Sequence, residues 1–391
     1  MLTFQKFSGI NNVLPPHRLG ESELARAVNC DIGLSGELRR RAGFTQLDAT
    51  CHKNLHERPD GVLLATHEGN ALVARAAGGA ETTVHPLLGP ERVWYCDLPD
   101  GRTLFSNGAI AGATRGGADQ GWGVPLPDAV GTAQGVPGSL HPGRYRWALT
   151  HVRLADGLEG GAVVSEPVDL PDGGLVLMDL PVLAGHGLRV YLSSRDGKAF
   201  YLAGDAVGSM FSFTGANAAL ALPCATLDCA PLPAGILPAF WRGRVLVARG
   251  DVLYASQPHR WELGIPARDF KRFSAPITLV QPANNGIWVG TQQELAFLAG
   301  TAFDALAYQQ AVPARVVLGS GVATPTGMVR AGEDILDAAM LCIADGVIVA
   351  GTHQGGAVRL TESRYATAAV EVSATLRMVD RVPQYLAVPQ A

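Results

Sequence analysis

The segments that decide the fold are two pairs of short apolar runs, each pair joined by a turn. Residues 244–255 read RVLVARGDVLYA, and residues 286–298 read GIWVGTQQELAFL. In both pairs the runs are almost entirely apolar, and polar or glycine residues separate them. Short apolar runs bounded by turn signals predict β-hairpins whose strands are buried on both faces.

The same pattern occurs three more times along the chain. Residues 61–74 read GVLLATHEGNALVA with a turn at 68–70, residues 102–111 read RTLFSNGAIA, and residues 346–360 read GVIVAGTHQGGAVRL. Two pairs of neighbouring copies start about 42 residues apart, which is the period of a β-propeller blade. Closure of the blades into a ring would also protect the strand edges. We therefore expect an all-β protein built on a β-propeller of about five blades.

The blade period breaks between residues 126 and 209, where six or seven other short runs occur. They include residues 145–152 (YRWALTHV) and 188–193 (LRVYLS), and Asp196-Gly197 is a tight-turn dipeptide. This density of strands predicts a small β-sandwich of the fibronectin-III type, inserted into the propeller after a hinge at residues 135–138. The expected domains are an N-terminal arm and hairpin (1–44), a first part of the propeller (45–136), the sandwich (137–207) and a second part of the propeller (208–391).

The arm has its own pattern. Residues 22–28 predict a short helix, and residues 30–34 and 38–41 predict a hairpin around Ser35-Gly36. The arm also contains the only dense basic run of the chain, which is formed by Arg39, Arg40 and Arg41. This run is either the solvated end of a strand or a contact with another subunit or with nucleic acid.

Composition excludes several classes of protein. The 391 residues include 31 Lys and Arg against 35 Asp and Glu, for a net charge of −4, and 47% of them are hydrophobic. Such a chain is too apolar to be disordered, and it lacks the basic field that captures duplex DNA. No apolar run is long enough to span a membrane, and the N-terminus does not resemble a signal peptide. Six scattered cysteines favour a reducing compartment over a disulfide framework.

Motifs for catalysis or metal binding are weak. His52 and His56 are four residues apart beside Cys51, a spacing that places two metal ligands on one face of a helix. Lys53 follows His52 directly, and no glutamate accompanies this first histidine. Both features favour a polar loop instead. Cys224 and Cys229 are separated by four residues rather than two, which favours ordinary buried or loop thiols. We therefore expect no catalytic residue, no cofactor and no metal site.

Two other short segments partly match known functional motifs, but turns explain them better. Residues 194–197 (SRDG) depart from the Asp-box turn of sialidase propellers, because the glycine comes one place early and no tryptophan follows. Residues 249–251 (RGD) match an integrin-binding tripeptide, but they lie where a blade hairpin requires a turn. The residues alone thus indicate a non-enzymatic binding or structural protein.

Two groups of segments resemble a known family. Residues 7–12 (FSGINN), 23–31 (ELARAVNCD) and 36–44 (GELRRRAGF) resemble the opening of structural proteins from bacteriophage tails. Residues 241–258, 266–270 and 286–291 resemble later segments of the same group of phage tail proteins. The family is the nozzle protein of short-tailed phages, also called the tail tubular or packaged-DNA-stabilising protein.

The resemblance implies a structural virion protein that forms a ring, typically a homohexamer, on the head-completion adaptor below the portal. The ring would retain the packaged genome and conduct it at ejection, so that double-stranded DNA passes without sequence recognition. Its flanks would carry tail fibre or spike proteins. The protein would be made in the bacterial host cytoplasm and would end in the virion tail. Arg39, Arg40 and Arg41 are possible assembly contacts.

Two alternatives remain open at the level of sequence. One is a glycan-binding or glycan-cleaving β-propeller with an accessory sandwich domain. The other is a fibre-attachment component of the same tail.

Overall fold

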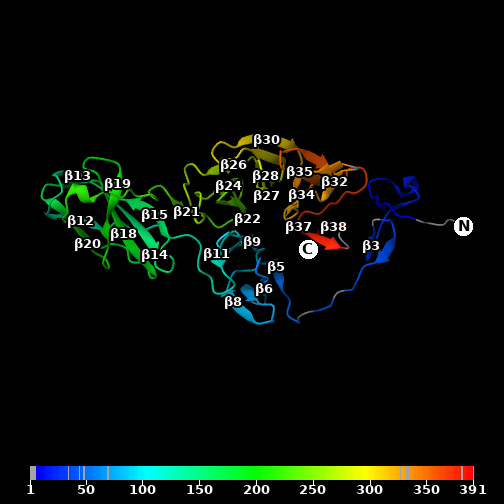
Figure 1. Ribbon diagram of the computed structural model, residues 1–391, viewed down its shortest axis with the longest axis horizontal. Coiled ribbons are helices and arrows are strands. Elements are labelled where there is room, and N and C mark those ends of the chain that lie inside the picture. The colour runs from blue at the N-terminus through cyan, green and yellow to red at the C-terminus, as the bar shows by residue number, and fades with distance from the viewer. Residues whose placement is uncertain are drawn as a thin grey trace.

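The protein is built almost entirely from β-strands, as a computed structural model of the chain shows (Figure 1). The structure describes residues 6–33, 35–43, 45–46, 49–67, 70–325, 327–331, 334–379 and 382–390. Part of the turn predicted at 68–70 therefore lies outside the described residues. Three modules follow one another in space: a sandwich at the left of Figure 1, a group of blades in the middle, and the arm at the right.

Five antiparallel sheets, each following the chain in order, form the blades. Each sheet contains one of the five predicted hairpins at its centre or outer side, so the propeller prediction is confirmed. Blades 1 and 2 consist of β5 (Lys53–Glu57), β6 (Leu63–His67), β7 (Ala71–Arg75) and β8 (Glu81–His85), then β9 (Trp94–Asp97), β10 (Thr103–Ser106) and β11 (Ala111–Thr114). Blade 3 consists of β22 (Ile236–Trp241), β23 (Arg244–Arg249), β24 (Val252–Ala255) and β26 (Phe270–Arg272). Blades 4 and 5 consist of β27 (Ile277–Ala283), β28 (Gly286–Thr291), β29 (Leu295–Ala299) and β30 (Ala307–Val312), then β31 (Val322–Ala323), β34 (Ala338–Ala344), β35 (Val347–Thr352) and β36 (Ala357–Arg359).

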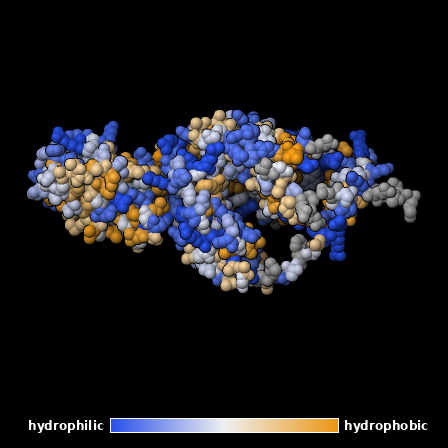
Figure 2. All heavy atoms as spheres, in the orientation of Figure 1, coloured by the Kyte–Doolittle hydropathy of each residue, from blue (hydrophilic) through white to orange (hydrophobic). Residues whose placement is uncertain are grey.

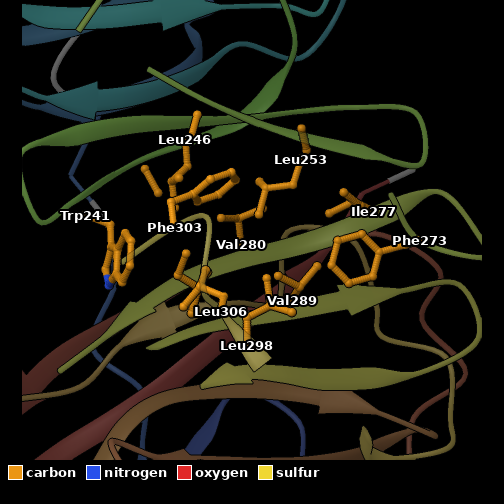
Figure 3. Packing of buried hydrophobic residues seen from close by; sticks show 14 residues of the cluster. Trp241, Leu246, Leu253, Phe273, Ile277, Val280, Val289, Leu298, Phe303 and Leu306 are labelled. Carbon is orange, nitrogen blue, oxygen red and sulfur yellow. The ribbon is translucent and has the colours of Figure 1, made fainter. Parts of the chain in front are cut away.

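The apolar runs are explained by packing between successive blades. In β23, Leu246 and Ala248 pack against blade 4, whereas Val245 and Val247 belong to the cluster shared with blade 2. Because alternate strand residues point to opposite faces, a blade between two neighbours needs apolar side chains at every position. Figure 3 shows the interface between blades 3 and 4, where Leu246 and Leu253 face Val289 and Leu298.

The C-terminal hairpin links the last blade to the first two. It consists of β37 (Val372–Val379) and β38 (Val382–Pro389) and packs on blade 5 through Leu376 and Tyr385. At its base, the Arg92 guanidinium donates hydrogen bonds to the Glu371 carboxylate (3.0 Å) and to the Val372 carbonyl (2.8 Å). Arg92 lies between β8 and β9 and is stacked over Trp94, 4.1 Å from the ring centroid. The hairpin therefore joins blade 5 to the connection between blades 1 and 2.

The inserted module is a nine-stranded sandwich between blades 2 and 3, which confirms the predicted insertion. Its main sheets have the orders β15-β14-β18-β19 and β12-β17-β20, and Trp147, Leu175 and Val190 lie in the core between them. The strands are β12 (Thr132–Pro137), β13 (Gly143–Tyr145), β14 (Trp147–Arg153), β15 (Glu159–Val164), β16 (Val168–Leu170), β17 (Gly173–Met178), β18 (His186–Ser193), β19 (Phe200–Asp205) and β20 (Phe211–Phe213). The sandwich thus extends beyond the predicted segment 137–207 at both ends. The predicted hinge at 135–138 overlaps β12, which pairs with β17 over its whole length.

The arm contains no helix at residues 22–28, so that prediction was wrong. Glu23–Leu24 forms strand β2, which pairs in parallel with β1 (Gly9–Ile10). The Glu23 carboxylate accepts hydrogen bonds from the Gly20 backbone N–H and from the Asn11 side chain, both 3.0 Å long. These tertiary contacts outweigh the helix preference of the local sequence. The predicted hairpin is present as β3 (Cys30–Ile32) and β4 (Leu38–Arg40).

Small two-stranded sheets complete the fold. They are β21 (Ala230–Pro231) with β25 (Leu263–Gly264), which lies where the chain returns from the sandwich, and β32 (Val329–Ala331) with β33 (Asp334–Leu336), beside blade 5. Short 3₁₀ turns occur at Pro16–Arg18 and Asn217–Ala219.

Candidate assembly surfaces

The three N-terminal segments that carry the family resemblance come together in one compact arm. The Phe7 backbone N–H donates to the Gly36 carbonyl (2.8 Å), which joins the first segment to the third. Asn11 is almost fully buried, and its side-chain oxygen accepts from the backbone N–H groups of Val13 and Leu14. Segments that are separate in the sequence therefore cooperate in one structural unit.

Asn12 clamps the arm to the segment that connects blade 5 with the C-terminal hairpin. The Asn12 side-chain amide donates to the Ala366 carbonyl (2.7 Å), and its side-chain oxygen accepts from the Ala366 backbone N–H (2.8 Å). The Asn12 backbone N–H donates to the Arg364 carbonyl (3.0 Å). An asparagine is well suited to this contact because its amide offers a donor and an acceptor side by side, as a peptide group does. The beginning of the chain is thereby held next to its end (Figure 1).

The three predicted contact arginines have different surroundings on β4. Arg39 forms an ion pair with Glu37 (2.9 Å), and Arg41 forms one with Asp31 (2.9 Å). Arg40 is exposed, and within the described ranges it has no ion pair. Exposed Leu38 lies beside it on the same strand. Of the basic run, Arg40 is therefore the side chain whose charge is available to a partner.

The sandwich is fixed to the propeller by a buried charge cluster. Glu262 of blade 3 accepts hydrogen bonds from Arg102 of blade 2, from Arg153 at the end of β14, and from the Gly123 backbone N–H. Glu262 is 2% exposed in its side chain, against 12% for Arg102 and 9% for Arg153. Asp100 and Asp156 each pair with one of the two arginines, so the cluster holds two cations and three carboxylates.

The charges of this cluster hold each other in the ionised state. Burial alone would lower the pKa of the Arg102 guanidinium, but hydrogen bonds and charge from Glu262 and Asp100 raise that pKa above its ordinary value. The pKa of Arg153 is raised in the same way, against burial, by Asp156 and Glu262. Close backbone packing supports the junction, because a methyl group at Gly161 would lie 1.7 Å from the Cys229 carbonyl oxygen. The sandwich is therefore rigidly attached.

The polar loop predicted around His52 and His56 is wrong from Lys53 onward, because residues 53–57 form strand β5 by pairing with β6, and the two histidines do not form one site. His56 lies on β5 and hydrogen-bonds with Asp97 of blade 2 (3.1 Å), while its ring stacks on Tyr95. His52 instead lies near Glu81 of its own blade, with 3.7 Å between Nε2 and Oε1. Across the ranges that the structure describes, no three His, Cys, Asp or Glu side chains are grouped so as to hold a metal ion.

The other weak motifs have turn or packing roles. Residues 249–251 form the turn between β23 and β24, with Gly250 at a φ of 61° and Asp251 paired with Arg272 (2.8 Å). Residues 194–197 join β18 to β19. Cys224 and Cys229 are free thiols, and burial raises the pKa of both.

Sequence reasoning missed the charge cluster at the junction. Arg102, Arg153 and Glu262 come from blade 2, the sandwich and blade 3, and no local pattern marks any of them. Asn11 and Asn12 lie within the segment 7–12, and nothing in that segment indicates which residues they bond to. The β-hairpins, by contrast, are indicated by the pattern of residues within one short segment.

Comparisons with known proteins found similar folds but no similar sequence. No protein-family model and no curated protein matches it. Among solved structures, BBS1N in complex with ARL6DN is 13% identical, with 87% of this chain and 89% of that chain covered and a TM-score of 0.33. The Dos1 propeller is 8% identical over 92% of this chain and 78% of that chain (TM-score 0.37), and the WD40 β-propeller domain of Doa1 is 7% identical over 87% and 90% (TM-score 0.29). Similarities this low carry no functional information, and the blades are defined by their own hydrogen bonding.

One further feature concerns membranes. No helix among the described residues is long and apolar enough to cross a lipid bilayer.

Proposed function

We propose that the chain is a structural protein of a short-tailed phage tail, which forms the nozzle ring below the portal and its adaptor. The ring retains the packaged DNA and conducts it at ejection. The observation that carries the proposal is the arm, because the three N-terminal segments that resemble the phage family build one unit, which Asn12 clamps to the segment between blade 5 and the C-terminal hairpin. Such a unit, at one end of an elongated molecule, can bind another protein of the tail without rearrangement.

The arm has the composition of an interface. Val28 and Leu38 are 66% and 44% exposed, and Arg40 projects from the same hairpin as Leu38. Exposed apolar groups next to arginine are typical of the centres of protein interfaces. In the proposed tail this surface contacts the head-completion adaptor ring.

DNA would pass through the centre of the ring of copies and not through the propeller itself. The inner strands of successive blades, β9, β22 and β27, lie directly against one another. Most residues of β27 are buried, among them Ile277 and Leu279. A conduit for sliding DNA should neutralise few phosphates, since each neutralised phosphate adds affinity through counterion release. The net charge of −4 supports this role.

The remaining surfaces fit the same assembly. The sandwich projects from the blades on a rigid junction, so it can present a fixed surface on the flank of a ring for a fibre or spike protein (Figure 1). The protein is then non-enzymatic, is made in the bacterial host cytoplasm, and ends in the virion tail. A fibre-attachment role in the same tail would use the same projecting sandwich.

The test is electron microscopy of tails assembled with the full-length protein and with arm variants. We expect six-fold rings with a central channel below the portal for the wild type, and loss of the ring for Leu38→Asp combined with Arg40→Glu. Arg144→Glu is the matched control, because Arg144 is an exposed strand arginine at the far end of the sandwich, in an ion pair with Asp169.

Two results would contradict the proposal. One is a tail whose ring below the portal does not contain this chain. The other is turnover of a chromogenic glycoside that a single Asp or Glu substitution abolishes, which would favour a glycan-cleaving propeller.

A further inference from the structure

One end of the sandwich is apolar and exposed. Three neighbouring loops meet there, because the Leu154 backbone N–H donates to the Gly185 carbonyl and the Leu180 N–H donates to the Ser209 carbonyl, both 3.0 Å. The exposed side chains of these loops are Leu154 (70%), Val182 (69%), Val207 (85%) and Met210 (53%). We call this surface the loop end. In Figure 2 hydrophobic atoms gather along the lower edge of the sandwich lobe at the left.

The loop end is unusual in size and charge. Four apolar side chains that are each more than half exposed lie on these adjoining loops, and exposed apolar patches often mark interaction sites. Residues 154–158, 179–185 and 206–210 contain Asp156 and Asp179 but no lysine or arginine. Membrane-binding loops combine apolar residues with basic ones, so this composition favours a protein partner.

Blade 1 has a groove on the face opposite blade 2. Leu64, Leu72 and Ala74 pack against blade 2. The alternate residues Leu63, Ala65 and Val73 line a groove of about 570 Å³ on the opposite face, together with Leu55. The linker residues Thr45 and Thr50 and the ion pair of Arg75 with Glu81 also line this groove. Leu55 is 68% and Leu63 37% exposed, and exposed Lys53 lies on the same strand as Leu55. We call this surface the blade-1 groove.

The two surfaces belong to different parts of the chain. The loop end belongs to the sandwich, which contacts blade 3 through the Arg153–Glu262 hydrogen bonds. The groove is on the face of blade 1 opposite the one that packs on blade 2. Each copy of the chain therefore carries both surfaces, and a contact between them can join two copies.

We propose that the loop end of one copy docks in the blade-1 groove of the next copy. Such a head-to-tail contact joins two different surfaces, and contacts of this type close into rings when the rotation between copies allows it. A standard interface buries about 800 Å² on each partner, with an apolar centre and a polar rim. The loop end and groove supply the centre, and Asp179 with Lys53 supplies opposite charges for the rim. This inference rests on the proposed ring, for which it names the lateral contact.

The test uses cross-linking between two single-site variants of the full-length chain. Val207→Cys marks the loop end and Leu55→Cys marks the groove, both in a Cys51→Ser background because Cys51 is exposed and close to the groove. A short bismaleimide should link the two variants when they are mixed and link neither variant to itself. The reaction is run over a concentration series and on assembled tails.

Charge variants supply a second readout. Val207→Asp and Leu55→Asp should each weaken self-association at least tenfold, and mixing Val207→Lys with Leu55→Asp should restore part of it. Leu222→Asp is the matched control, because Leu222 is a 64% exposed leucine that follows the sandwich strands and lies outside the loop end. This control should assemble as the wild type does.

The possible outcomes separate the two proposals. Rings that form equally well with Val207→Asp would overturn this contact and leave the proposed nozzle standing. Cross-links of Val207→Cys with itself would indicate a two-fold symmetric dimer and would also overturn it. Wild-type protein that neither self-associates nor forms a ring in tails would remove both the contact and the proposed function.

Discussion

Arg153 of the sandwich and Glu262 of the propeller form two parallel hydrogen bonds. Each of the two terminal guanidinium nitrogens donates to one carboxylate oxygen, and both bonds are 3.1 Å long. This bidentate geometry fixes orientation as well as distance. Both side chains are buried, so neither charge can exchange its partner for water. The junction therefore holds an inserted domain at one angle, where a flexible linker would allow many.

Removal of the Glu262 charge should destabilise the protein strongly. Glu262→Gln keeps the shape of the side chain but leaves Arg102 and Arg153 buried without their shared carboxylate. Breaking a buried ion pair by removal of one partner costs about 3–5 kcal/mol. Urea unfolding, followed by circular dichroism and by proteolysis at the junction, should show this loss.

The exposed pair of Arg144 and Asp169 is the control for this effect. Its side chains are 60% and 75% exposed, so Arg144→Gln should leave the free energy of unfolding almost unchanged. Equal losses for Glu262→Gln and Arg144→Gln would mean that the junction cluster contributes nothing beyond a surface contact.

Acid should weaken the contact between blades 1 and 2. Burial works to raise the pKa of Asp97, but hydrogen bonds from His56 and Thr103 outweigh it and keep that pKa below its ordinary value of 3.8. A carboxylate whose pKa is depressed by folding contributes stability above the unfolded pKa and loses it as the pH falls through the folded pKa. The contribution of Asp97 is thus complete above about pH 5 and is lost progressively as the pH falls below that and through the lowered folded pKa.

Measurement of unfolding free energy against pH for Asp97→Asn tests this expectation. The variant should be less stable near neutral pH, and its stability should fall less steeply than that of the wild type between about pH 5 and pH 3. Asn substitution of the exposed Asp304 serves as the matched control. An unchanged acid slope in Asp97→Asn would argue against a role for this carboxylate.

The six thiols should react with alkylating agents in a fixed order. Burial raises the pKa of Cys342 to about 12, and burial with the nearby Asp97 charge raises that of Cys96 to about 12. The thiolate is the reactive form, so both groups should be inert in the folded protein. Cys51 is exposed and should be labelled first.

Mass spectrometry of iodoacetamide adducts over time would establish this order. Cys96 and Cys342 should become labelled only when the protein unfolds, and Cys51→Ser should remove the fastest phase. Rapid labelling of Cys342 under native conditions would show that blade 5 opens locally.

The blade hairpins could be predicted because each is specified by a dozen adjacent residues. Gly250, at a positive φ, turns the chain between two apolar strands, and both features are visible in the sequence. The boundary of the sandwich could not be located as well, because Gly135 and Pro137 resemble a linker. They lie on β12, an edge strand, where a proline removes no essential ladder hydrogen bond.

The contacts that position the modules were beyond sequence reasoning for a different reason. Arg153 and Glu262 are 109 residues apart, and Asn12 and Ala366 are 354 residues apart. An arginine, a glutamate or an asparagine has no local feature that tells a buried partner from a solvated one. For residues 22–28 the local signal even favoured the wrong structure, because the pairing of β2 with β1 depends on a segment earlier in the chain.

Deletion of the sandwich should leave a folded propeller only if the cut follows the structure. The cores between blades 3 and 4 and between blades 4 and 5 contain no sandwich residue. Residues after β20 still lie on the sandwich, since the Leu202 backbone N–H donates to the Leu222 carbonyl and the Cys224 N–H to the Phe200 carbonyl. The deletion should therefore remove residues 132–224.

A Gly-Ser linker of about ten residues, with an average span of about 17 Å, would join the ends. This variant should be soluble, with a β-rich circular dichroism spectrum and a cooperative thermal transition. Deletion of residues 137–207 should aggregate instead, because it leaves β12 and β20 without β17, the strand with which both pair. If both deletions fold equally well, β12 and β20 are not integral to the sandwich. If neither folds, the propeller depends on the Arg153–Glu262 contact for its own stability.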